Sequence, residues 1–207
     1  NDLGTLGGNG SGALGINERN EVGGYAREGS GFFAFHAFRY DGVMEDLGTL
    51  GGNESRAQGI NDAGDIVGWS VTGDGVMHAF LYSWGVMYDL GTLGGILSEA
   101  YGINAAGQVV GTSRTTDGAS AAFIFHGSHG MLDLYALAGG AASGWDRLIE
   151  ARAINDVGQI VGTGIINGET RAFMLTPTAV PLPGAVWLFG SGLAALIGVT
   201  RGRARRS

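Results

Sequence analysis

The sequence predicts an all-β fold: a β-propeller-like array of four four-stranded repeats of about 43 residues each, covering residues 1–176. Two observations predict it. Glycine accounts for 41 of 207 residues and proline for only three, a composition typical of short strands joined by tight turns. The chain also repeats itself, and nowhere in the repeats do apolar residues hold a helical period over ten residues.

The repeat is defined by four landmarks in a fixed order. Asp-Leu-Gly-Thr-Leu-Gly-Gly comes first, then Gly-Ile-Asn or Ala-Ile-Asn, then a Val-Gly pair, then an Ala-Phe pair. The first landmark occupies 2–8, 46–52 and 89–95, with a degraded copy at 133–140. These positions set the repeats at about 2–45, 46–88, 89–132 and 133–176. The phenylalanines of the Ala-Phe pairs recur at one strand phase, so we expect them in the core: Phe38, Phe80, Phe123 and Phe173.

In the second repeat we expect strands at about 57–61, 65–70, 78–83 and 86–90. Asn61-Asp62-Ala63-Gly64 suits a type I turn, with Asn first and Gly fourth. The equivalent fourth positions, Asn20, Gly107 and Gly158, are residues that tolerate positive φ. Asp41-Gly42 and Trp84-Gly85 mark a second hairpin turn.

The phasing of the repeats suggests a way to close a ring. The chain opens on an expected strand at 3–6 and its last unit ends on one at 172–175, so the first could complete the last blade. The units could instead be the last four of a longer array. An open β-solenoid or a sandwich is the structural alternative.

The body resembles the HAF-repeat family of extracellular proteins. The resemblance rests on His36-Ala37-Phe38, on His78-Ala79-Phe80 and on the Asp-Leu-Gly-Thr-Leu-Gly-Gly segments, and it covers residues 2–175. The third and fourth units depart, with Ala121 and Arg171 at the histidine position. The resemblance implies export but supplies no biochemical activity.

After residue 176 the composition changes. A linker at 177–183 precedes an uncharged, mostly apolar stretch, which we expect to form a transmembrane helix over 184–200. The basic tail, 201–207, contains Arg201, Arg203, Arg205 and Arg206. Arginines after the span place the C-terminus in the cytoplasm and the repeats on the other side of the inner membrane.

This tail resembles the PEP-CTERM class of sorting signals, specifically the VPLPA-CTERM variant. The matching motif is Val180-Pro181-Leu182-Pro183, followed by the apolar stretch and the basic end; Gly184 stands where the variant usually has Ala. The resemblance implies a partner, an exosortase-type membrane transpeptidase that removes the helix. It also implies a Gram-negative-type host that makes exopolysaccharide, with the mature protein at the cell surface or in the extracellular matrix.

Composition excludes several classes of function. Cysteine is absent, which removes disulfides, thiolate metal sites and cysteine nucleophiles. Up to residue 200 the chain has 8 arginines and no lysine against 19 acidic residues, a net charge of −11, which argues against nucleic-acid binding. The sequence begins at Asn1 with no leader-like segment, so either a leader has been removed or the sequence is a fragment.

The recurring polar residues could form rings of calcium ligands, but we interpret them as caps of turns and strand ends. They are Asp2, Asp46, Asp89 and Asp133, with Asn17, Asn61, Asn104 and Asn155. Only two of the four repeats have a histidine at this position, His36 and His78. We therefore expect no metal site and interpret both histidines as partly buried strand residues. No motif indicates catalytic residues or a cofactor.

The fourth repeat carries about seven extra residues near 143–149. Trp145, Asp146, Arg147 and Glu150 gather here, and an aromatic ring beside charged groups would suit sugar binding. The alternative is a variable loop with a packed tryptophan. We therefore expect an exported, non-catalytic repeat protein that binds envelope polysaccharide or protein. A glycan-active propeller enzyme and a membrane-tethered ligand sensor are the alternatives.

Overall fold

The computed structural model describes residues 1–29 and 35–177. Asn1–Thr176 form one compact unit, and Pro177–Ser207 form a second. The expected sorting motif, transmembrane helix and basic tail all lie within 178–207, outside the described residues. Within the described part of the chain, no helix is long and apolar enough to cross a membrane.

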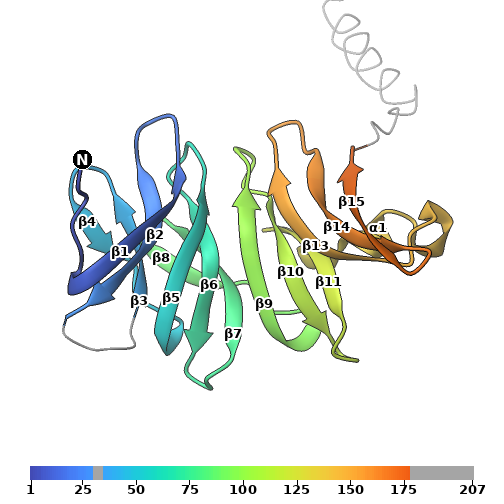
Figure 1. The fold of residues 1–207 in the computed structure, drawn as a ribbon, viewed down its shortest axis with the longest axis horizontal. Coiled ribbons are helices and arrows are strands. Elements are labelled where there is room, and N and C mark those ends of the chain that lie inside the picture. The colour runs from blue at the N-terminus through green and yellow to red at the C-terminus, as the bar shows by residue number, and fades with distance from the viewer. Residues whose placement is uncertain (30–34, 178–207) are drawn as a thin grey trace, which may run out of the picture. The chain divides into compact units, whose positions relative to one another are not determined.

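The described chain is all-β and consists of four antiparallel sheets, each built from strands that follow one another in sequence (Figure 1). Sheet 1 contains β1 (Gly7–Ile16), β2 (Val22–Glu28), β3 (Phe35–Tyr40) and β4 (Met44–Asp46). Sheet 2 contains β5 (Gly51–Ile60), β6 (Ile66–Thr72), β7 (Met77–Ser83) and β8 (Val86–Asp89). Sheet 3 contains β9 (Gly94–Ile103), β10 (Val109–Thr115), β11 (Ser120–His126) and β12 (Gly130–Asp133).

Sheet 4 has three strands rather than the expected four: β13 (Arg147–Ile154), β14 (Ile160–Ile166) and β15 (Glu169–Leu175). The array is also open. Figure 1 shows the four sheets in a row, with the N-terminus beside sheet 1 and β15 in the sheet at the other end. The expected closure of a ring by the N-terminal strand is therefore wrong. Residues 1–5 form no strand, and Leu6 makes only an isolated bridge to Glu28.

The first strand of each of the first three sheets begins at the Gly-Gly pair. In sheet 2 it runs from Gly51 rather than from residue 57. A Cβ on Gly52 would lie 2.6 Å from the backbone oxygen of Val71, so a side chain there would prevent the close pairing of β5 with β6. The preceding Asp-Leu-Gly-Thr-Leu residues cross from one sheet to the next.

The turns between the first and second strands have the expected conformation. Asn20, Gly64, Gly107 and Gly158 all have positive φ, and Gly64 N–H donates to the Asn61 carbonyl at 3.0 Å. The degraded segment of the fourth repeat behaves differently. It forms a short helix, α1 (Leu134–Leu137), and a 3₁₀ turn at Gly140–Ser143, neither of which the strand pattern predicted.

The core lies between sheets. The first strand of each later sheet packs on the second and third strands of the sheet before it. Alanines and the recurring phenylalanines fill each boundary, and all four phenylalanines are buried, as expected. Between sheets 2 and 3, for example, Ala79, Val67 and Phe123 share one apolar cluster. No sheet has a core of its own, so each depends on its neighbours.

Candidate functional site

The recurring asparagines hold the turn that joins the first two strands of each sheet. The Asn61 side-chain oxygen accepts from the N–H groups of Ala63 (3.0 Å) and Asp65 (2.9 Å). Asn104 does the same with Ala106 and Gln108. This arrangement satisfies backbone donors that the turn leaves without a strand partner, so the interpretation as caps is confirmed.

The same asparagines also join neighbouring sheets. The Asn17 Nδ2 donates to the Asn61 carbonyl at 3.0 Å, the Asn61 Nδ2 to the Asn104 carbonyl at 3.2 Å, and the Asn104 Nδ2 to the Asn155 carbonyl at 3.1 Å. The result is a ladder of side-chain amide hydrogen bonds that joins the four turns. This ladder was not predicted, although one asparagine stands at the same place in every repeat.

The four turns surround a pocket of about 190 Å³. Every sheet contributes to its wall, which combines carboxylates and amides with one isoleucine from each of the first three sheets. The lining residues are Ile16, Asn17, Glu18, Ile60, Asn61, Asp62, Ile103, Ala105 and Asp156. Two carboxylates are held by neighbouring turns: Asp62 accepts from the Glu18 N–H (2.9 Å) and Asp156 from the Ala105 N–H (2.8 Å). Because this pocket requires all four repeats, we treat it as the candidate binding site.

The recurring aspartates cap the crossings between sheets. Asp2, Asp46 and Asp89 each accept from the N–H two residues on, at 2.9, 2.8 and 2.7 Å, and Asp133 caps the start of α1 through Tyr135. Each carboxylate thus has a local structural role. They do not form a ring of ligands around the candidate site.

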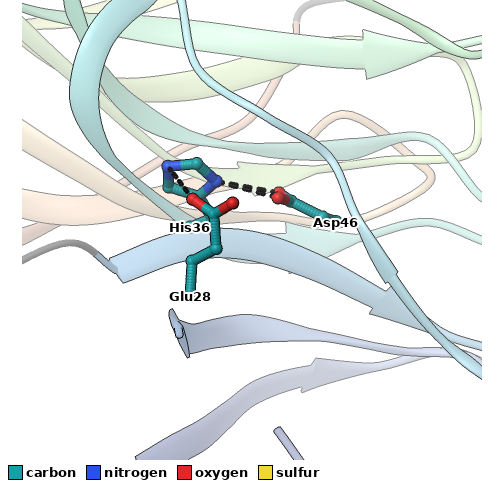
Figure 2. A group of neighbouring side chains, drawn as sticks. All are labelled: Glu28, His36 and Asp46. Atoms are coloured by element: carbon teal, nitrogen blue, oxygen red, sulfur yellow. Dashed lines mark hydrogen bonds and ion pairs between the residues drawn. The ribbon is translucent and has the colours of Figure 1, made fainter. Parts of the chain in front are cut away.

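His36 lies between two carboxylates (Figure 2). Its Nδ1 is 2.9 Å from the nearer oxygen of Asp46, and its Nε2 is 3.7 Å from Glu28. The three ligand atoms lie close enough to hold a metal ion. In sheet 2, however, His78 meets Asp89 at the same 2.9 Å, and Thr72 occupies the position of Glu28. The histidine–aspartate pair therefore forms without the third carboxylate, which favours its interpretation as a structural contact.

Three residues of the expected ligand loop contact different parts of the structure. Trp145 packs edge-to-face on Phe173, with ring centroids 6.1 Å apart, and joins the core between sheets 3 and 4. Asp146 accepts from the Gly168 N–H, and Glu150 pairs with Arg152 at 2.8 Å. Arg147, at the start of β13, is exposed. The alternative of a variable loop with a packed tryptophan describes this segment.

A polar cluster between sheets 3 and 4 was not foreseen. The Arg152 guanidinium lies 4.3 Å from the ring centre of Tyr101, whose hydroxyl donates to Glu99. Burial, followed by the nearby Glu99 carboxylate, raises the pKa of Tyr101 well above its usual value of 10.0. This phenol is therefore a stable hydrogen-bond donor at neutral pH. No repeat pattern indicated this cluster, because its members do not recur in the other repeats.

No family model and no curated protein matches this chain. Among solved structures, the chain is similar to TolB from Acinetobacter baumannii, with a TM-score of 0.54 and 13% sequence identity. The match covers 80% of this chain and 40% of the TolB chain. At this identity the likeness shows the fold alone, a β-propeller-like all-β array. This chain thus spans less than half the length of the solved structure it matches.

Proposed function

We propose that this chain is an exported, non-catalytic repeat protein of the cell surface or extracellular matrix, which binds polysaccharide in the pocket between its four turns. The observation that carries the proposal is that all four repeats contribute to this one pocket. The wall is largely polar, and its carboxylates and amides supply acceptors and donors for sugar hydroxyls. Envelope protein is the second class of ligand considered.

A non-catalytic role is supported by the structural contacts that the recurring polar residues already make. The asparagines hold turns and join sheets, and Asp46 and Asp89 cap crossings while contacting histidines. Export and sorting are supported by the two sequence resemblances.

Ligand binding can be tested by calorimetric titration of the full chain with exopolysaccharide fragments. Glu18→Gln keeps the size of a pocket carboxylate but removes its charge, and should weaken binding roughly tenfold, the worth of one hydrogen bond to a charged group. Asp74→Asn, at the exposed turn between β6 and β7, is the matched control and should leave affinity unchanged. Equal affinities of both variants for the fragments would show that the ligand does not bind in this pocket.

Catalysis and sorting have separate tests. Release of reducing ends from the same fragments, abolished by one acid-to-amide change, would show a glycan-active enzyme instead.

The intact mass of the protein from its native host tests the tail: loss of the chain beyond about Pro183 supports exosortase processing. A chain intact to Ser207 in the inner membrane would favour the tethered sensor.

A further inference from the structure

Each boundary between the first three sheets is closed by the same hydrogen bonds. The Ser55 hydroxyl accepts from the Ala37 N–H at 2.8 Å and donates to the Gly48 carbonyl at 2.6 Å. At the next boundary, Ser98 makes equivalent bonds to Ala79 and Gly91, at 2.8 and 2.6 Å. A buried serine on the first strand of one sheet therefore clips the third strand of the sheet before it.

The carbonyl of the same alanine is used as well. Leu47 N–H donates to the Ala37 carbonyl at 2.9 Å, and Leu90 N–H to the Ala79 carbonyl at 3.0 Å. Each leucine directly follows the last residue of a fourth strand. The alanine thus has both backbone groups satisfied, one by the residue that follows its own fourth strand and one by the next sheet.

Sheet 4 has the alanine side of this interface, but among the described residues no further sheet supplies the serine side. Within the described residues, β15 is an edge strand, and its Ala172 is exposed, whereas Ala37, Ala79 and Ala122 are fully buried. The same difference holds for the neighbouring apolar side chains. Val161 is 42% exposed, although its equivalents Val67 and Val110 are fully buried, and Met174 is 65% exposed.

Sheet 1 and the residues before it have the serine and leucine that such an alanine would bond. The Ser11 hydroxyl already donates to the Gly4 carbonyl at 2.7 Å, as Ser55 and Ser98 do in their sheets, and so is oriented to accept from an alanine N–H. Leu3 follows Asp2 just as Leu47 follows Asp46. Ala13 is exposed, while its equivalents Ala57 and Ala100 are fully buried.

We infer that a second copy of this chain docks head-to-tail, with sheet 1 of one copy seated on sheet 4 of another. The open array keeps the two halves at opposite ends of the row, so one chain does not bring them together (Figure 1). Continuity with the two boundaries between the first three sheets fixes the geometry. Ala172 would bond Ser11 and Leu3 of the second copy, and residues 1–3 of that copy would add to β15 as its missing fourth strand.

The register follows from the other sheets. The residue after each Ala-Phe pair faces the residue before the aspartate: Arg39 pairs with Glu45, and Ile124 with Leu132. By the same rule Met174 faces Asn1 of the second copy. Such an interface is heterologous, so it makes a ring if the rotation closes and a longer chain if it does not.

The register can be tested with cysteines, because the natural chain has none. Paired strand positions lie within disulfide distance. Full chains carrying Asn1→Cys are mixed with full chains carrying Met174→Cys under mild oxidation. We expect a mixed disulfide of twice the 21.2 kDa chain mass on a denaturing gel. Mixing Asn1→Cys with Asp74→Cys is the control and should give only background cross-linking.

Two results would overturn the inference. One is cross-linking no greater than in the control mixture. The other is an internal disulfide in monomers of a chain that carries both Asn1→Cys and Met174→Cys, which would show a chain closing on itself.

A second measurement avoids cysteines. Light scattering of the full chain should give a multiple of the chain mass, and Val161→Glu should reduce it to the single-chain mass. Val157→Glu, at an exposed turn of the same sheet, should leave it unchanged. A monomeric natural chain, or an assembly that survives Val161→Glu, contradicts the inference. Neither result bears on glycan binding in the pocket.

Discussion

The side-chain amide of Asn61 donates to the backbone carbonyl of Asn104 at 3.2 Å, and this bond ties the first turn of sheet 2 to the equivalent turn of sheet 3. The same side chain accepts from two N–H groups of its own turn. One buried residue therefore sets both the shape of the turn and the placement of the next sheet. Stability should be concentrated at such boundary residues.

Replacement of Asn61 with alanine should lower the free energy of unfolding by about 2 kcal/mol, because buried donors and acceptors lose their partners. Asn155→Ala removes an exposed asparagine whose Nδ2 bonds Gln159 within its own turn. It should cost well under half as much. Urea unfolding measures both, and equal losses would argue against the role of the ladder.

Ser98→Ala should be similarly costly, by about 2 kcal/mol, because it leaves the Ala79 N–H and the Gly91 carbonyl without partners in a buried boundary. The matched variant is Ser128→Ala, whose hydroxyl lies in an exposed turn and contacts the rings of His126 and His129. Thermal unfolding of the two variants compares them. A Ser98 variant as stable as the Ser128 variant would contradict the role of the Ser98 hydrogen bonds.

Gly111→Ala should be more damaging than either Asn61→Ala or Ser98→Ala. Its Cβ would lie 2.0 Å from the backbone oxygen of Glu99, so β9 and β10 would have to separate. We expect a loss of at least about 3 kcal/mol. Gly10→Ala, where the nearest atoms are 4.0 Å away, should be nearly neutral. The far-ultraviolet circular dichroism of both variants against urea provides the measurement.

Stability should fall at high pH because of Tyr101. Its pKa is raised in the folded chain, so below pH 10 both states keep the proton and the contribution is fully present. Above pH 10 the unfolded chain loses that proton first, which favours unfolding until the folded pKa is reached. Tyr101→Phe should make this alkaline loss shallower, whereas Phe in place of the exposed Tyr88 should not. Identical pH profiles would mean that burial of Tyr101 is not the cause.

Added zinc should not change the relative stability of the His36 and His78 variants. If both histidines only orient an aspartate, His36→Ala and His78→Ala should cost similar stability, about 1 kcal/mol each, with or without added zinc. Melting temperatures at increasing zinc concentration check this. A zinc-dependent stabilisation lost only in His36→Ala would instead show that Glu28, His36 and Asp46 bind the ion.

The sequence by itself determined the repeat, the strand class and the turns. The spacing of the Asp-Leu-Gly-Thr-Leu-Gly-Gly segments fixed one sheet per repeat, and turn chemistry is local enough that Asn20 and Gly64 could be assigned positive φ in advance. The burial of Phe80 and Phe123 also followed from their phase in the strand. Local geometry depends on neighbours in sequence, which the sequence displays.

Only the tertiary structure decided how the sheets meet. Whether four sheets close depends on small rotations at each boundary, and no residue pattern states their sum, so ring closure was wrongly expected. The Asn61–Asn104 bond, the serine clips and the pocket between the turns join residues about 20 to 50 positions apart. The tertiary structure also decided the packing of the tryptophan in the expected ligand loop, because Trp145 contacts Phe173 on another strand.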